Sequence, residues 1–338
     1  MTARDHRGGI DGLGWLWPVA APVAPVLFAV AALQFLGAPD LPKDEIAKVM
    51  GQSGATALRH SGDRLAYVAS VCVHTGVCLA TAFYFVIMLH RLAIDGRRQA
   101  VAALTAIAGT TLVLMIVLSW IDPPLTVYAL SYFNIDAVLR ASALAADLTG
   151  EGPPGALSPL AVAVLFPSAL GIIDVALAAG VVCLLLRRIG PPHADGWEMR
   201  FQTNIRPLFR SFYGLGAVLV TSTATELFFF RLPVGLVNPQ ASGDVGAALG
   251  TYASAVATFW GAVYTLTLFA VFACPLAILY ARARRHVEAD GDTEPDLGTW
   301  LAEHGFDSTL AQNLKNLLVM LAPLLIGPLG ELARAASG

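Results

Sequence analysis

The sequence predicts an all-α integral membrane protein, a polytopic helical bundle of about six transmembrane helices with a short C-terminal helical module. Its composition is the first reason. Of 338 residues, 56% are hydrophobic and 13% are charged, whereas soluble domains average about 45–50% and about 25%. The second reason is that apolar runs of about 20 residues, the length that crosses a bilayer, recur along the chain. The net charge of -3 offers no basic surface for a phosphate backbone, so no nucleic-acid partner is expected.

Six apolar runs are long enough to span and are free or nearly free of charge. They lie at about 15–37, 65–90, 100–121, 160–186, 209–230 and 251–281. A transmembrane bundle at 15–286 therefore follows a cytoplasmic N-terminus at 1–14. A cleaved signal peptide is the rival interpretation of the first run, because Arg4 and Arg7 precede it. We favour an uncleaved span because the run is longer than a usual signal-peptide core.

The distribution of Lys and Arg predicts the orientation. With the N-terminus inside, the inner segments hold fifteen of the 21 Lys and Arg, and the outer connections hold six. Cytoplasmic connections carry the excess of positive charge in membrane proteins. We therefore expect a multi-pass protein of the inner (plasma) membrane with both termini cytoplasmic and the lipid bilayer as its surroundings.

Two outer connections carry helical signals of their own. Residues 38–64 contain a short helix that opens at Pro42, and Ser61 is suited to cap the second span. The segment at about 125–147 has the pattern of an amphipathic helix at the membrane interface. A seventh span in this region would place the basic segment 187–210 outside, against the charge rule.

The C-terminal part changes character. An acidic segment at 287–297 predicts a solvated linker, and residues 298–338 form the predicted C-terminal helical module. Its apolar stretch, 314–332, is interrupted by Pro323 and Pro328 and has a core shorter than a comfortable span. An interfacial or re-entrant helix, an oligomer contact and a seventh span remain open for this stretch.

Three ionisable residues fall at membrane depth, namely Asp174, His74 and Glu226. A central charge costs about 2.5–3.5 kcal/mol on insertion scales, so such residues are candidates for function. Asp174 lies near the midplane of the fourth span. It shares a helical face with Pro167 and Gly171, which lets a neighbouring helix approach and turns the carboxyl into the bundle.

Further polar residues extend this candidate path. Arg231 lies about a turn and a half beyond Glu226 at the outer end of the fifth span, and Thr258 and Thr265 belong to a polar stripe on the sixth. If these faces meet, they line a polar path with Glu226 and Arg231 as an outer gate. Ordinary helix packing by hydroxyl and small side chains is the alternative for all of them.

Three functions follow as hypotheses. The first is movement of a small solute or ion, with Asp174 as a protonatable or cation-facing group and His74 as a relay. The second is a non-enzymatic membrane scaffold or subunit that docks a partner or a second copy through its C-terminal apolar helix, giving a homo-oligomer. The third is an enzyme acting on a lipid-linked substrate, for which Asp122 offers one carboxylate without an evident partner. We expect no catalytic residue, cofactor or metal ligand set, because no enzyme signature occurs and all four cysteines lie in apolar runs.

Overall fold

The structure is a computed structural model that describes most of the chain. It describes residues 22–36, 41–51, 53–94, 127–150, 158–192, 195–238, 244–290, 297–304 and 310–337, with scattered positions between 101 and 111. The N-terminal segment 1–14, most of the predicted third span and part of the acidic linker therefore lie outside the described residues.

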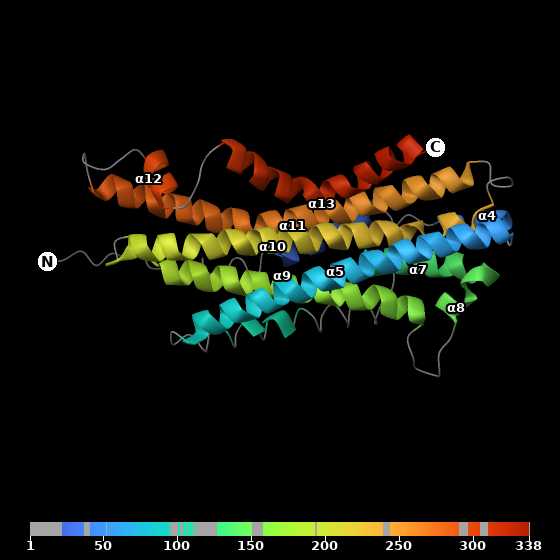
Figure 1. Ribbon diagram of the computed structural model, residues 1–338, viewed down its shortest axis with the longest axis horizontal. Coiled ribbons are helices and arrows are strands. Elements are labelled where there is room, and N and C mark those ends of the chain that lie inside the picture. Colours follow the sequence, from blue (N-terminus) through green and yellow to red (C-terminus); the bar gives the residue numbers. More distant parts are fainter. Residues whose placement is uncertain are drawn as a thin grey trace.

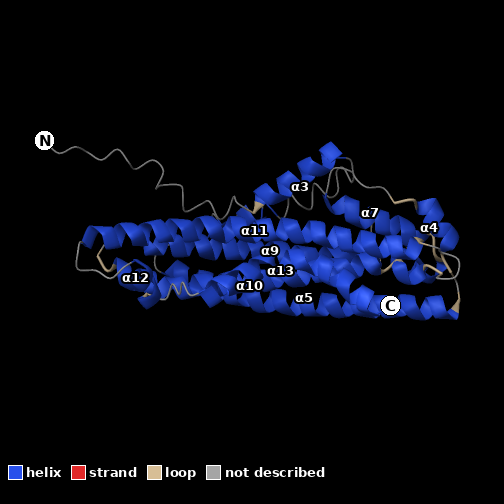
Figure 2. Cartoon of the chain, turned by 90° about the horizontal axis from the view of Figure 1, so that it is seen from above, coloured by secondary structure: helices blue, strands red, loops and turns tan. Residues whose placement is uncertain are grey.

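Four long helices form the body of the molecule and lie side by side along its long axis (Figures 1 and 2). They are α5 (Gly54–Ile94), α9 (Pro159–Ile189), α10 (Trp197–Arg231) and α11 (Val245–Asp290). All four are long and apolar enough to cross a membrane. The prediction of an all-α membrane protein is confirmed, whereas the count of six spans is not. The first predicted span is described in part, as α3 (Val23–Leu36), which packs on α11.

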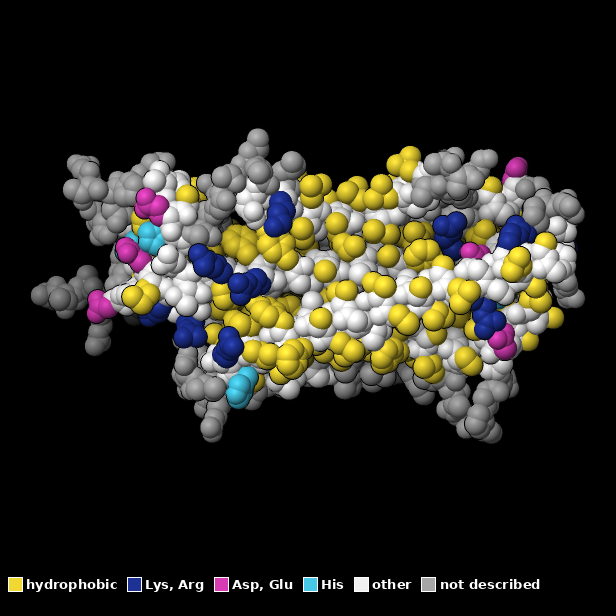
Figure 3. All heavy atoms as spheres, viewed as in Figure 1, with side chains coloured by type: hydrophobic (Ala, Val, Ile, Leu, Met, Phe, Trp, Pro, Cys, Tyr) yellow, Lys and Arg dark blue, Asp and Glu magenta, His cyan; other side chains and the backbone are white. Residues whose placement is uncertain are grey.

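The long helices extend beyond their apolar runs. Helix α5 has 41 residues, a length of about 60 Å at 1.5 Å per residue, which is twice the roughly 30 Å of a hydrocarbon core. Hydropathy locates only the apolar part of such a helix. Figure 3 shows the result on one face of the molecule, where an apolar middle separates charged side chains gathered toward the two ends.

Capping side chains explain where two of these helices begin. Ser158 Oγ accepts a hydrogen bond of 3.1 Å from the Ala161 N–H at the start of α9, which satisfies a backbone donor that the helix leaves free. Ser53 Oγ does the same for the Thr56 N–H at 3.2 Å, so α5 begins three turns earlier than expected. Ser61, the predicted cap, instead donates to the Ala57 carbonyl oxygen inside the helix.

Short helices gather at one end of the bundle, which we call the α4 end (Figure 1). They are α4 (Lys43–Val49), α7 (Val127–Arg140), η3 (Ala143–Ala145), α8 (Ala146–Thr149) and η4 (Val234–Leu236). The segment 125–147 thus forms several short helices instead of one, and α7 with 14 residues is too short to span. Met50 and Val237 form an isolated β-bridge that ties α4 to η4.

The opposite end carries α12 (Leu297–Glu303), and we call it the α12 end (Figure 1). The indole of Trp300 stacks on that of Trp197 at the start of α10, with ring centroids 5.8 Å apart. Both side chains are 2% exposed, so α12 is held against the bundle by apolar burial. Helix α11 continues to Asp290, into the segment that the sequence predicts as a linker.

Helix α13 (Leu310–Ser337) runs along α10 and α11 from the α12 end toward the α4 end (Figure 1). Three of its contacts with α10 join partners 103 residues apart, so the two helices run parallel: Asn316 with Tyr213, Val319 with Gly216 and Gly330 with Leu227. The first and the last of these contacts are 14 residue steps apart, or about 21 Å at 1.5 Å per residue. The predicted C-terminal module therefore includes a helix that lies along the bundle over much of its length.

Candidate functional site

A fully buried carboxyl group lies halfway along α9. Asp174 is 0% exposed, and its Oδ2 accepts a hydrogen bond of 3.0 Å from Thr81 Oγ1 of α5. Its Oδ1 is buried and has no hydrogen-bond partner in the part of the chain that the structure describes. A buried carboxyl with one oxygen unsatisfied is costly for stability alone, so this residue requires a further explanation.

The face of α9 that carries Gly171 lies against α5. A Cβ atom built on Gly171 would lie 3.8 Å from His74 Nε2, so the His74 ring of α5 packs directly over the glycine. His74 is itself 0% exposed. The close approach of α5 and α9 at this point brings Asp174 and His74 to the same side of the interface.

Both ring nitrogens of His74 have hydrogen-bond partners. Nε2 lies 3.1 Å from the Pro167 carbonyl oxygen, which can only accept, so this nitrogen carries a proton. Nδ1 lies 2.9 Å from Thr221 Oγ1. The Thr221 hydroxyl also lies 3.0 Å from the carbonyl oxygens of Ala217 and Val218. It can therefore donate to Nδ1 or accept from it, and His74 keeps both bonds as neutral imidazole and as imidazolium.

Cys78 joins His74 to Asp174. Its Sγ lies 3.5 Å from His74 Nε2, and the thiol interacts electrostatically with the Asp174 carboxyl. A thiol is a weak donor and a weak acceptor, so it supports a chain of polar contacts. We call this chain the polar seam, and its members are Asp174, Thr81, Cys78, His74 and Thr221.

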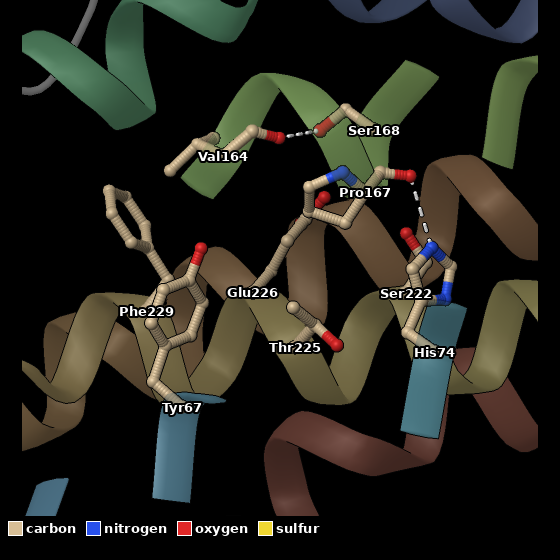
Figure 4. Close-up of a pocket in the computed structure, with 9 residues that line it drawn as sticks. All are labelled: Tyr67, His74, Val164, Pro167, Ser168, Ser222, Thr225, Glu226 and Phe229. Atoms are coloured by element: carbon tan, nitrogen blue, oxygen red, sulfur yellow. Dashed lines mark hydrogen bonds between the residues drawn. The ribbon is translucent and has the colours of Figure 1, made fainter. Parts of the chain in front are cut away.

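A small pocket continues the polar seam toward the α4 end (Figure 4). Its lining residues are Tyr67, His74, Val164, Pro167, Ser168, Ser222, Thr225, Glu226 and Phe229. The volume of about 30 Å³ is enough for one or two water molecules. Pro167 shapes the pocket because it has no N–H to give the Ala163 carbonyl, and the Tyr67 hydroxyl donates to that oxygen instead at 2.9 Å.

Glu226 lies at this pocket with one oxygen unused. Its Oε1 accepts a hydrogen bond of 2.6 Å from the Tyr264 hydroxyl of α11, while Oε2 is buried without a partner among the described residues. Helices α5, α9, α10 and α11 thus each contribute polar side chains to one connected region.

Other sequence candidates lie elsewhere. No ion pair joins Glu226 to Arg231, both of which the structure describes, and the guanidinium acts electrostatically on Asp63 instead. Glu226 and Arg231 are five residues apart on α10, which corresponds to a rotation of about 140° around the helix axis, so their side chains point in different directions.

The polar stripe predicted on the sixth span, which includes Thr258 and Thr265, lies on α11 and packs at Thr258 against α13. Thr258 donates to the Ser254 carbonyl oxygen and lies against Gly327 of α13. Thr265 Oγ1 is buried without a partner in the described residues, and the Thr258 hydroxyl bonds within α11 and not to the polar seam. The stripe therefore serves helix packing at Thr258, and the polar seam is built from α5, α9 and α10.

Sequence reasoning missed Tyr67, Thr221 and Tyr264. Two of them carried a usable signal, because Tyr67 precedes His74 by seven residues and Thr221 precedes Thr225 by four, so each shares a helical face with its neighbour. Tyr264 carried none, because the rotation of α11 decides whether its hydroxyl reaches Glu226.

An apolar layer closes the polar seam on its other side. The side chains of α9 from Ala178 to Leu186 are at most 2% exposed, and Phe85 and Leu215 from the neighbouring helices are 0% exposed in the same cluster. The polar groups from Glu226 to Asp174 therefore lie in the middle of the bundle, with this layer on one side and a second apolar cluster, around Phe229 and Phe230, between them and the α4 end.

Comparison of the chain with family models, with curated proteins and with solved structures finds no match. The geometry of the polar seam is therefore the basis for a functional assignment.

Proposed function

We propose that the protein moves a small ion or polar solute across the membrane along the polar seam. The observation that carries this proposal is the buried Asp174, with one oxygen free, linked through Cys78 to a histidine that fits two protonation states. Intramembrane ionisable groups are expensive and occur mainly on substrate or ion pathways.

The arrangement supports an alternating mechanism. Polar groups extend from Glu226 to Asp174, with the apolar layer around Phe85 on one side and the apolar cluster around Phe230 on the other. An ion crosses the membrane when these two apolar regions part in turn, and it occupies the polar seam between the two openings. The proline at position 167 in α9 and the small residues beside it are natural points for such a movement.

The proposed topology places the α4 end outside and the α12 end in the cytoplasm of a cell with an inner (plasma) membrane. The basic side chains near the α12 end support this choice: Arg91, Arg187, Arg188, Arg200, Arg206, Arg210, Arg282, Arg284, Arg285 and Lys315. The six predicted spans remain part of the proposal. The parallel register of α13 with α10 favours a seventh crossing, which places the C-terminus outside and not in the cytoplasm.

The test is a flux assay in proteoliposomes under imposed gradients of small ions and solutes. Asp174→Asn keeps the size of the side chain and removes its charge. The control is Asp195→Asn, the same change at an exposed position. We expect wild type and control to transport and Asp174→Asn to lose at least about tenfold, which corresponds to 1.36 kcal/mol in a barrier. Equal flux in all three proteins contradicts the proposal.

The alternative function is a membrane scaffold that pairs with a second copy through α13. It is favoured by leucines that α13 turns away from the bundle, namely Leu317, Leu318, Leu325, Leu329 and Leu332, which are 39–66% exposed. Lipid is the other occupant that such a face suits. The test is the oligomer mass in detergent of Leu318→Asn, with Leu266→Asn on α11 as the control that should leave the mass unchanged. An unchanged mass for Leu318→Asn also counts against the scaffold.

A further inference from the structure

We propose that the ion carried by the polar seam is a proton, and that water in the pocket between Glu226 and His74 relays it. This inference rests on the proposed transport function and names its substrate.

The unused oxygen of Glu226 is the first reason. Oε2 is buried, without a partner among the described residues, and Glu226 lines the pocket together with His74 (Figure 4). A buried acceptor of this kind binds water where space and further polar atoms allow it. The pocket volume of about 30 Å³ provides the space.

The pocket hydroxyls supply the further polar atoms. Ser168 donates its hydrogen to the Val164 carbonyl oxygen at 2.8 Å, and Thr225 donates to the Thr221 carbonyl oxygen at 2.9 Å. Each hydroxyl oxygen keeps lone pairs that accept hydrogen bonds from water. A water in this pocket thus has several acceptors around it and a carboxyl group beside it.

The oxygen atoms at the pocket are too few to bind a metal cation. Transporters hold Na⁺ with free carbonyl oxygens of unwound helix segments. At the proline of α9, the carbonyl oxygens of Ala163 and Pro167 already accept hydrogen bonds from Tyr67 and His74. Across the described residues, no group of three or more His, Cys, Asp or Glu side chains comes together as a metal site. One free carboxylate oxygen suits a proton better than a cation that requires a full shell.

The titratable groups around the pocket are few. Tyr264 of α11 and Tyr67 of α5 face Glu226, while Cys78 of α5 and, beyond it, Asp174 of α9 face His74. No Lys or Arg lines the pocket. Without a fixed positive charge nearby, the carboxyl group is free to gain and lose a proton in each cycle.

The proposed transfer is balanced. The water takes a proton from the Glu226 carboxylic acid as it gives one of its own to the Thr221 hydroxyl oxygen, and the Thr221 hydroxyl passes its hydrogen to Nδ1 of neutral His74. Glu226 becomes a carboxylate, His74 becomes imidazolium, and the total charge of the pair stays unchanged. His74 keeps its contacts because the Thr221 hydroxyl reverses from donor to acceptor. The next acceptor is Asp174, which Cys78 connects to the ring.

The test uses the purified full chain in proteoliposomes loaded with a pH-sensitive dye, without Na⁺, and with a K⁺ diffusion potential to drive proton entry. Glu226→Gln removes the proton site and keeps the shape. Glu303→Gln is the matched control, because Glu303 is exposed on α12. We expect wild type and control to change the internal pH. The rate in Glu226→Gln should fall by about a hundredfold, a typical loss when a proton-transfer group is removed.

The outcomes separate this inference from the proposed function. Flux of another ion or solute without proton movement overturns the proton and leaves transport standing, whereas no flux of any kind overturns both. Proton flux that survives Glu226→Gln but not Asp174→Asn overturns the role of Glu226.

An infrared measurement guards against a variant that fails to fold. Wild-type protein taken from acid to alkaline pH should lose the carbonyl-stretch band of a protonated buried carboxyl. Glu226→Asp should shift that band, and an unchanged band assigns the proton to another group and overturns the relay.

Discussion

Replacing Gly261 by alanine tests whether α13 belongs to the bundle. A Cβ atom at this position would lie 2.8 Å from the carbonyl carbon of Pro323 and 2.9 Å from the Cα of Leu324. Both are backbone atoms of α13, which no side-chain rotation can move. The two helices must separate by several tenths of an ångström, which also loosens the contact between Gly327 and Thr258 one turn away.

The magnitude follows from overpacking and from a matched control. Inserting a methyl group into a closely packed interface lowers the free energy of unfolding by about 1–3 kcal/mol. Replacing a helical glycine by alanine raises it by roughly 0.5–1 kcal/mol. Gly76→Ala on α5 has the same helix gain, but nothing lies within 4 Å of its Cβ. The difference in unfolding free energy between the two variants should therefore be about 1–3 kcal/mol.

The assay is reversible unfolding of both variants in mixed detergent micelles, followed by circular dichroism. We expect Gly261→Ala to unfold more readily than Gly76→Ala. Equal stabilities would refute the close packing of α11 on α13, and with it the assignment of α13 to the bundle.

Three further predictions concern the caps, the closure and the topology. Ser158→Ala removes the hydrogen bond to the Ala161 N–H and should cost about 1 kcal/mol in unfolding free energy; an unchanged unfolding curve contradicts the cap. Phe85→Ala opens a cavity in the apolar layer. It should lower the free energy of unfolding by about 3–5 kcal/mol and raise the passive ion leak of proteoliposomes. A variant with unchanged stability and unchanged leak argues against the role of the apolar layer as a barrier. A tag attached after Gly338 should be cleaved by protease added to intact spheroplasts, because the register of α13 carries the C-terminus toward the α4 end. Cleavage only after lysis of the spheroplasts returns the C-terminus to the cytoplasm.

Much of the fold is legible in the sequence because hydropathy is local. The apolar runs at 65–90, 160–186, 209–230 and 251–281 coincide with parts of α5, α9, α10 and α11. Their polar extensions are not legible, since a helix that leaves the bilayer keeps its hydrogen bonds while losing its hydropathy signal. For this reason α5 begins at Gly54, well before its apolar run.

Helix α13 shows where sequence reasoning stops. Pro323 and Pro328 suggest an interrupted segment, but both lie inside one continuous helix. The sequence does not reveal that the backbone at Pro323 is placed against Gly261 of α11. Such a fit depends on the relative shift of two helices that are far apart in the chain.

The candidate site was partly predictable for a similar reason. The spacing of Pro167, Gly171 and Asp174 defines one face of one helix, so their common direction follows from helical periodicity. Which neighbour that face meets depends on the rotation of each helix, which the sequence does not encode locally. His74 does meet this face, whereas the stripe that includes Thr258 meets α13.

The most direct test of the transport path is the charge displaced when protein on a solid-supported membrane receives a sudden change of ion or proton concentration. Wild type should give a transient current, and Asp174→Asn should give none under the same conditions. Equal currents from the two proteins, or no current from wild type in any gradient, would contradict a transport path through Asp174.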